Sequence, residues 1–376
     1  MNKKQLPEGW RMVKFGEMAK HISKRVEPSK TDLEIYVGLE HLDPDSLRIK
    51  RHGVPSDVAG QKLLVQKGQI IFGKRRAYQR KLGIAEWDCI CSAHAMVLEA
   101  NPETVLPEFL PFFMQSDVFM NRAVAVSEGS LSPTIKWKVL SEQKFSLPNK
   151  EMQQRYLSVI CVAEKSLVLA EEAICSAQNL LSISRGVLLN SFTNSCTLGD
   201  VAEIVMGQSP KGINCSTEKV EISIPLLNGP TEFGYKHPIP AQYTIEKTRM
   251  ANEGDILFCV RGSTTGRMNL ADQRYCIGRG LAAISGKPEK AETAYIFHIL
   301  CNIKNSIFNE AKGAGSTFPN IASNQLRGWT IPYHTEDERF SITKALDSSA
   351  QTLSLLQKKR ERILILKMTI LNDIGK

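Results

Sequence analysis

Short apolar runs bounded by glycine- and proline-rich turns alternate in this chain with longer stretches of helical periodicity. The runs at 69–72, 95–98 and 255–260 have the length and composition of buried strands. Residues 108–124 and 294–311 repeat apolar side chains every three to four positions, which is the spacing of one face of an amphipathic helix. The pattern therefore predicts globular segments of mixed α/β structure.

Two further stretches carry an apolar residue at every seventh position, which is the pattern of a coiled-coil seam. Asn149 can cap the first helix, which we expect to end near Phe192. Thr335 and Glu338 form a capping box for the second helix, which we expect to reach Ile374. The seam positions are Ile160, Leu167, Ile174, Leu181 and Leu188 in the first helix and Ile342, Leu356, Ile363 and Ile370 in the second.

A row of small residues accompanies the first seam. Ala163, Ala170 and Ala177 follow its first three positions, so a partner helix can approach closely there. A helix of about 40 residues spans ~60 Å, and two such helices in one chain most simply pair with each other. We expect antiparallel pairing, which would place the two globular segments at opposite ends. The alternative is that each helix packs only on its own globular segment.

Four pairs of similar segments, in the same order, indicate that the chain contains one unit twice. The pairs are 65–72 with 251–258 and 129–135 with 315–321 at an offset of 186, 14–19 with 197–202 at 183, and 145–148 with 329–332 at 184. The duplication predicts a first globular domain at 1–148, a spacer helix at 149–192, a second globular domain at 193–332 and a second spacer helix at 333–376.

Charge and composition narrow the class of partner. The 376 residues carry a formal net charge of +9, which favours an anionic partner, and nucleic acid is the commonest one. The polar start at 1–8 has no secretory signal, and no apolar run approaches the ~18 residues of a membrane span. The nine cysteines are scattered without a C-x-x-C pair. We therefore expect reduced thiols in the cytoplasm, without disulfides or a metal site.

The densest chemical signal is the basic run that follows the apolar strand at 69–72. Arginine can reach guanine in bidentate fashion, lysine neutralises phosphates, and an aromatic ring can stack. A merely solvated basic turn is the alternative. The candidate DNA contacts in this run are Lys74, Arg75, Arg76, Tyr78, Gln79, Arg80 and Lys81. At the same place in the second copy they are Arg261, Ser263, Thr264, Thr265 and Arg267.

A second pair of loops carries hydroxyls, amides and a lysine that suit contacts to phosphates and base edges. Such residues are also ordinary turn formers. The candidates are Ser130, Ser132, Thr134 and Lys136 in the first copy and Ser316, Thr317 and Asn320 in the second. Arg279 is added because it lies, like His94 in the first copy, where a strand begins. Equivalent loops with different side chains predict two different readings, hence an asymmetric DNA site.

Signatures of catalysis do not occur. The segment Gly68–Arg75 fits G-x-x-x-x-G-K, but Arg75 stands where a phosphate-binding loop needs Ser or Thr, and Ile-Ile-Phe in its middle reads as a strand. The sequence has no N-P-P-[FY] or D-P-P-Y motif for base methylation, no G-x-G-x-x-G, no G-x-S-x-G and no H-E-x-x-H. We therefore expect no catalytic residue and no cofactor in this chain.

Several segments together resemble the specificity subunit of type I restriction-modification systems, over nearly the whole length. They are the opening Leu6–Trp10, the run Tyr36–Asp45, the loop Phe72–Arg80, the segment Gly254–Phe258 and the two junctions at which a long helix follows a proline. One departure is that neither long helix opens with the usual Pro-x-x-Glu-Gln run of the family. Residues 149–154 and 333–338 stand there instead, which bears on which modification subunit is accepted.

The resemblance implies two target recognition domains, each reading half of a bipartite double-stranded DNA site, with the coiled-coil helices as spacer. It also implies docking of two modification subunits, adenine methyltransferases that bring S-adenosylmethionine. Restriction subunits, with ATP and Mg²⁺, can join that complex. Two other functions are compatible with the residues alone. One is a coiled-coil scaffold whose basic loops bind acidic proteins without sequence-specific DNA binding, and the other is an enzyme with an unrecognised site.

Overall fold

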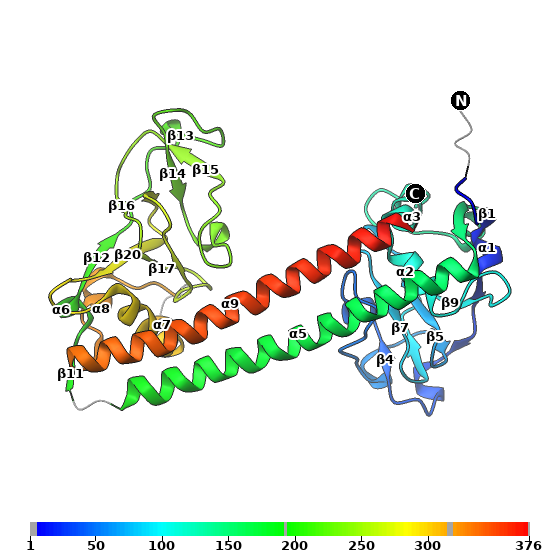
Figure 1. The fold of residues 1–376 in the computed structure, drawn as a ribbon, viewed down its shortest axis with the longest axis horizontal. Coiled ribbons are helices and arrows are strands. Elements are labelled where there is room, and N and C mark those ends of the chain that lie inside the picture. The colour runs from blue at the N-terminus through cyan, green and yellow to red at the C-terminus, as the bar shows by residue number, and fades with distance from the viewer. Residues whose placement is uncertain (1–5, 192–193, 314–318, 375–376) are drawn as a thin grey trace. The chain divides into compact units, whose positions relative to one another are not determined.

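The computed structural model of the chain describes residues 6–191, 194–313 and 319–374 (Figure 1). The chain divides into two compact units. Unit 1 comprises Met1–Glu171 and Lys358–Lys376, and unit 2 comprises Glu172–Gln357. Each unit therefore contains one globular domain and one portion of each long helix. The division falls inside the helices, whereas the boundaries expected from the repeat lie where the helices begin.

The globular domain of unit 1 is built on two four-stranded sheets and a two-stranded ribbon. The first sheet is antiparallel, in the order β2 (Ala19–Ile22), β9 (Ala95–Ala100), β6 (Ile70–Gly73) and β7 (Leu82–Ile84). The second sheet has the order β3 (Arg25–Val26), β5 (Lys62–Val65), β8 (Cys89–Cys91) and β4 (Tyr36–Val37), and the ribbon pairs β1 (Trp10–Lys14) with β10 (Lys144–Pro148).

Strand β6 is apolar throughout because it lies between two cores. Successive side chains of a strand point to opposite faces, so Ile70 and Phe72 pack into the core that includes the helices of the domain. Ile71 points the other way, into the core formed with the second sheet. Residues on both faces of β6 are therefore buried, and the loop that follows Gly73 starts from a fixed point.

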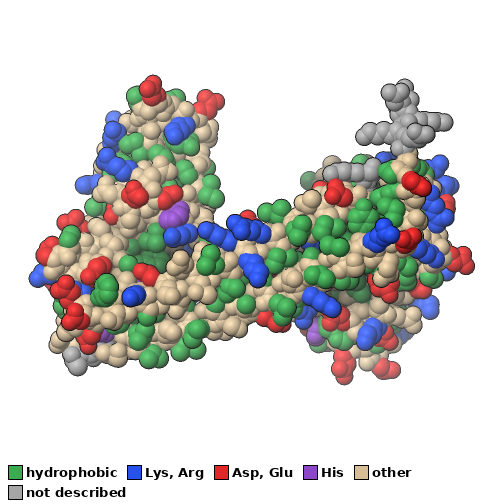
Figure 2. All heavy atoms as spheres, viewed as in Figure 1, with side chains coloured by type: hydrophobic (Ala, Val, Ile, Leu, Met, Phe, Trp, Pro, Cys, Tyr) green, Lys and Arg blue, Asp and Glu red, His purple; other side chains and the backbone are tan. Residues whose placement is uncertain are grey.

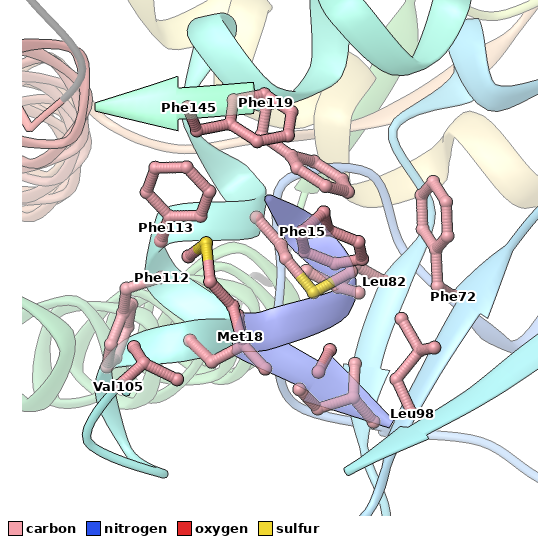
Figure 3. Close-up of a cluster of buried hydrophobic side chains, with 14 of the residues drawn as sticks. Phe15, Met18, Phe72, Leu82, Leu98, Val105, Phe112, Phe113, Phe119 and Phe145 are labelled. Atoms are coloured by element: carbon pink, nitrogen blue, oxygen red, sulfur yellow. The ribbon is translucent and has the colours of Figure 1, made fainter. Parts of the chain in front are cut away.

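The larger core of unit 1 is rich in aromatic rings. Phe15, Phe113, Phe119 and Phe145 meet at ring-centroid distances of 5.0–6.1 Å (Figure 3). Tilted and edge-on ring pairs add to the free energy gained by burying each ring. The rings come from α1 (Phe15–Met18), α2 (Phe109–Gln115), α3 (Asp117–Ala125) and β10.

The single helix expected over 108–124 is wrong, because α2 and α3 are separate helices. Ser116 between them has an extended backbone, with φ −62° and ψ 151°. Its hydroxyl accepts a hydrogen bond from the N–H of Phe119 at 3.3 Å and donates one to the carbonyl of Phe113 at 2.6 Å. The serine thus ends one helix and caps the next, which offsets the loss of a backbone hydrogen bond at the break.

Unit 2 repeats this plan. Its first sheet has the order β12 (Ala202–Met206), β20 (Leu281–Gly286), β17 (Ile256–Cys259) and β18 (Met268–Leu270). Its second sheet has five strands, β13 (Cys215–Ser216), β15 (Gln242–Thr244), β14 (Ile224–Leu227), β19 (Tyr275–Ile277) and β16 (Met250–Ala251), and β11 (Asn194–Thr197) pairs with β21 (Thr330–Tyr333). Like β6, β17 lies between two cores, with Phe258 in one and Leu257 in the other. The helix expected over 294–311 is α7 (Thr293–Gly313), and a short helix, α8 (Ser323–Arg327), follows the second loop.

Both long helices begin at the expected caps. The side-chain oxygen of Asn149 accepts the N–H of Met152 at 2.9 Å before α5 (Lys150–Asn190). Thr335 and Glu338 exchange hydrogen bonds of 2.9 and 3.4 Å before α9 (Glu336–Asp373). These contacts satisfy N–H groups that a helix start leaves without an intrahelical partner.

Within unit 1, α5 and α9 pair antiparallel. Glu164 of α5 forms an ion pair with Lys367 of α9, and Glu171 forms one with Arg360 at 3.1 Å. The residue number rises along one helix as it falls along the other, which is the antiparallel arrangement. The fold class predicted from the pattern, two similar α/β domains with antiparallel coiled-coil helices, is confirmed.

The helices also pack on the globular domains. In unit 1 the large core takes in Ile160 of α5 with Leu371 of α9, and in unit 2 the corresponding core takes in Leu181 with Ile342. Helix pairing and packing on the domains, which the pattern left as alternatives, therefore occur together. Of the seam positions, Ile160, Leu167, Leu181 and Ile342 are buried, and Ile174, Leu188, Leu356, Ile363 and Ile370 are partly buried. No helix in the described ranges is both long and apolar enough to cross a membrane.

Candidate nucleic-acid interface

The two loops singled out in the first copy lie against each other. Arg75 and Thr134 form an isolated antiparallel bridge. The N–H of Arg76 donates to the carbonyl of Pro133 at 2.7 Å, and the N–H of Ile135 donates to the carbonyl of Lys74 at 3.0 Å. We call residues 74–81 and 128–136 together paired-loop site 1.

The second copy repeats these contacts 186 residues later. Arg261 bridges to Asn320, the N–H of Gly262 donates to the carbonyl of Pro319 at 2.9 Å, and the N–H of Ile321 donates to Val260 at 2.9 Å. We call residues 260–267 and 319–321 paired-loop site 2. The two sites share one backbone frame and differ in side chains. The candidates Ser316 and Thr317 lie outside the described residues.

Two arginines of site 1, Arg75 and Arg76, bond to neighbouring side chains on the surface of the loops. Nη1 of Arg75 lies 3.2 Å from Nε2 of His94. Nε of Arg76 donates to the hydroxyl of Ser132 at 3.2 Å, and Arg76 has a left-handed backbone with φ 57°. The ring of Tyr78 is 55% exposed. Arg76 and Tyr78 are thus exposed, and Arg75 is half-buried, on a frame that is held from both sides.

Cations crowd this surface strongly enough to affect one another. Burial lowers the pKa of Lys74, and the nearby charge of Arg25 lowers it further. Burial also lowers the pKa of His94, and the charges acting on it, those of Arg75, Lys74 and Lys62, are all positive. The pKa of His21 is lowered by burial and by Lys74. Nearby positive charges make it harder to add a proton to these side chains, and the same positive potential attracts phosphate groups.

Three of the predicted contact residues are turned inward. Arg80 donates to Asp45 at 2.5 Å and to the carbonyl of Gln115 at 2.6 Å, and it forms an ion pair with Asp117 at 3.0 Å. Lys81 donates to the carbonyl of Leu39 at 2.6 Å. In site 2, Thr265 is buried and its hydroxyl donates to the carbonyl of Gly262 at 2.8 Å. We assign these three side chains to holding the loops in shape.

The remaining candidates are accessible to different degrees. Exposed side chains are those of Ser130, Lys136, Arg261, Ser263, Thr264, Arg267, Arg279 and Asn320, and partly buried ones are those of Gln79, Ser132 and Thr134. Lys136 forms an ion pair with Glu128 at 2.6 Å. The N–H of Arg279 donates to the hydroxyl of Ser209 at 3.3 Å. Site 2 thus presents separated arginines among hydroxyls and an amide, where site 1 presents clustered cations and an aromatic ring.

Sequence reasoning missed one side chain in site 1. Leu131 lies within the loop that was singled out, but no role was expected for it, and it is 92% exposed. Apolar periodicity carries no signal for a single leucine in a turn, so its exposure is visible only in the structure. Among the described residues, no group of three or more His, Cys, Asp or Glu side chains is placed to hold a metal ion.

Comparison with known families identifies the class to which this fold and these sites belong. Residues 7–167 and 193–364 match the family described as type I restriction modification DNA specificity domain. The two matched segments correspond to the two copies of the repeat. The chain belongs to this family, as the resemblance in the sequence implied.

Individual relatives agree with that membership. The chain is 25% identical over 407 aligned positions, 98% of its length and 93% of the relative, to a protein of Methanocaldococcus jannaschii described as a type I restriction enzyme MjaX specificity subunit. A 26% identity over 158 residues, 40% of this chain and 34% of the relative, links it to the HindI specificity subunit of Haemophilus influenzae.

Solved structures share the fold. A chain from a structure on complex assembly and conformational transition of the type I R-M system is similar with a TM-score of 0.61 at 24% identity, covering 98% of both chains. The type I S subunit from M. genitalium is similar with a TM-score of 0.64 at 14% identity, covering 99% of this chain and 98% of the other.

Proposed function

We propose that this chain is the DNA-reading subunit of a type I restriction-modification complex, with each paired-loop site reading half of a bipartite, asymmetric site in double-stranded DNA. The observation that carries the proposal is the pair of equivalent backbone frames with different side chains. A common frame suits a common geometry of approach to the duplex, and different side chains suit different base sequences.

The chemistry of the two sites fits this division of labour. Clustered cations at site 1 neutralise phosphates, which gives an affinity that falls steeply with salt. Arg75 and Arg76 have the planar fork that pairs with the O6 and N7 acceptors of guanine. In site 2, Arg261 has the same fork, and the amide of Asn320 can pair with the N6 and N7 groups of adenine. Each good bidentate pair contributes about 1–3 kcal/mol of discrimination.

The long helix α5 supports docking of modification subunits, because it is apolar on a second face. On its unit 1 portion, Val159, Val162 and Leu169 are 50–64% exposed, and they lie away from the seam. Apolar side chains are visible on the surface of the long helices in Figure 2. A groove of about 380 Å³ adjoins this face in unit 1, lined by Met152, Arg155, Tyr156, Val159 and Ile370. Such a face suits an amphipathic helix of a partner protein.

The unit 2 portion of α5 carries the same feature. Leu180, Ile183 and Val187 are 61–65% exposed there. One apolar face in each unit fits two modification subunits, which would bring S-adenosylmethionine and extrude the target adenine from the stack. This chain would carry no catalytic group or cofactor. Restriction subunits, with ATP and Mg²⁺, can join the complex, and DNA as substrate implies the cytoplasm.

The central experiment maps methylated adenines made by the complex of this chain with its modification subunits. Arg75→Ala should relax one half-site by about 1–3 kcal/mol, and Arg261→Ala should relax the other. Lys67→Ala is the matched control, because Lys67 is exposed at the opposite end of β6 from site 1. A continuous recognition sequence with no unread gap, or an equal loss at both halves from each variant, would contradict the proposal.

A second experiment tests the spacer role. Inserting one heptad into both α5 and α9 adds about 10 Å of helix, which corresponds to about three base pairs of B-DNA at 3.4 Å each. The gap between half-sites should lengthen accordingly. A scaffold that binds acidic proteins predicts no DNA gap to change. An unchanged gap in a folded variant would exclude the helices as the ruler.

The docking faces are tested by charge. Val162→Glu with Leu169→Glu should release a modification subunit without lowering the melting temperature, because these side chains face solvent. Cys161→Glu, an exposed change on the same helix outside the apolar row, should leave the complex intact. Full retention of both subunits by the double variant would refute docking at this face.

A further inference from the structure

Leu131 stands at the tip of a small hairpin in site 1. Glu128 and Thr134 exchange two backbone hydrogen bonds of 3.1 and 2.9 Å, and Gly129 turns the chain with φ +108°. The intervening residues form the tip, where Leu131 is 92% exposed between Ser130 and Ser132. Single exposed apolar residues are common on protein surfaces, so exposure alone carries no argument. Its support and its surroundings do.

The hairpin is held at its base and along one side. Lys136 and Glu128 form an ion pair of 2.6 Å at the base. On the side, Arg76 binds the tip twice, through its N–H to the carbonyl of Pro133 at 2.7 Å and through Nε to the hydroxyl of Ser132 at 3.2 Å. The leucine is therefore presented in advance, and little conformational entropy remains to be lost when it enters a partner.

The surroundings of Leu131 select the partner. Arg76, which holds the tip, is exposed and cationic. The preceding residue, Arg75, lies beside His94. A neutral apolar partner would leave these charges without solvent or counter-charge. A DNA duplex offers phosphates to the arginines and an apolar base stack to the leucine at the same time. Leucine is one of the side chains that wedge between base steps.

Resting on the proposed function, we propose that Leu131 is a wedge that enters the duplex at a base step of the half-site read by site 1 and unstacks it. Unstacking one step lowers the cost of extruding a nearby adenine into a modification subunit. In the sequence, Thr317 stands at the place of Leu131 in the second copy, 186 residues later. The next residue in that loop, Phe318, is apolar as well. Because Leu131 itself belongs to site 1, the half-site read by site 2 is an internal control for its substitution.

The test uses the complex with its modification subunits and duplexes that carry 2-aminopurine beside the target adenine of one half-site or the other. Its fluorescence rises when stacking is lost. Leu131→Ala should remove most of the rise in the half-site of site 1 and leave the other half-site unchanged. Leu131→Met, which keeps an apolar side chain of similar length, should retain the signal. The melting temperature of both variants is the control for folding, and it should not change because the side chain is exposed.

Other outcomes overturn the inference. An unchanged fluorescence rise in Leu131→Ala shows that the side chain does not open the stack. Loss of a modification subunit with normal fluorescence on the remaining DNA complex shows that Leu131 contacts protein instead. An equal loss in both half-sites shows a general defect in binding. Footprinting of the wild-type protein distinguishes the proposed function from the wedge. Failure to protect a bipartite site refutes the proposed function. Normal protection together with an unchanged fluorescence rise in Leu131→Ala refutes only the wedge.

Discussion

Replacing Arg80 by methionine tests whether this cation stabilises the loop, in contrast to Arg75, which we propose contacts DNA. Methionine keeps the apolar stem and removes the guanidinium. Arg80 and Arg75 stand in the same basic run, but Arg80 is directed at Asp45, Asp117 and the carbonyl of Gln115. We expect Arg80→Met to lower stability and leave the salt dependence of DNA binding unchanged.

The magnitude follows from how exposed each partner is. The bond to the carbonyl of Gln115 is the most buried, because Gln115 as a whole residue is 1% exposed, and a hydrogen bond to a charged donor contributes about 1.5–3 kcal/mol. The carboxylates of Asp45 and Asp117 are 34% and 48% exposed, so solvent screens each ion pair to about 0–1 kcal/mol. The total is about 3 kcal/mol.

Scanning calorimetry measures this loss. For a unit of this size, about 3 kcal/mol corresponds to a fall of roughly 10 °C in the melting temperature. Arg75→Met is the matched variant and should do the opposite, with an unchanged melting temperature and a loss of about 1–3 kcal/mol of discrimination at one half-site. An Arg80→Met protein that melts normally and loses a phosphate contact would refute the structural assignment of Arg80.

For three further substitutions, the structure predicts the direction in which stability changes. Lys367→Ala should lower the free energy of unfolding of unit 1 by about 3 kcal/mol, because Glu164 loses its partner. The double variant Lys367→Met with Glu164→Leu should leave that free energy nearly unchanged. A denaturant titration that shows the same loss of stability in both variants would contradict this. Burial lowers the pKa of His298 below its ordinary 6.5, so folded unit 2 binds fewer protons, and its stability should be full above about pH 6.5 and decline below it. His298→Gln should flatten that profile, and an unflattened one would place the titration elsewhere. Arg76→Gly should leave the melting temperature nearly unchanged, because relief of about 1 kcal/mol of left-handed backbone strain offsets the lost bond from Nε to Ser132, while discrimination at one half-site is lost. A large fall in the melting temperature in scanning calorimetry would contradict this balance.

Much of the architecture can be predicted because it is local. The strand before Gly73 is apolar on both faces, and the capping residues Asn149 and Thr335 predict where the two long helices begin. The duplication then carries each assignment from one copy to the other. The break between α2 and α3 also has a local signal, since Ser116 followed by Asp117 is a helix start, but the apolar spacing continues through it and conceals it.

The roles of the loop side chains are not local. Arg75 and Arg80 are five residues apart in one basic run and are chemically the same in the sequence. Their difference is made by Asp45, which is 35 residues away, and by Asp117, which belongs to another helix. The exposure of each cation thus depends on tertiary partners that lie far away in the sequence, so a local sequence pattern does not predict it. The exposure of Leu131 depends in the same way on a hairpin closed by its neighbours.

The contacts that frame each paired-loop site join main-chain atoms: Arg76 to Pro133 and Ile135 to Lys74 in one copy, Gly262 to Pro319 and Ile321 to Val260 in the other. Main-chain groups are the same whatever the residue, so the frame survives exchange of most side chains on it. Arginine and glycine already occupy one equivalent position, 76 and 262. Under the proposed function, a lineage can therefore acquire a new recognition sequence by point substitutions at the rim of the loops, with neither core having to be repacked.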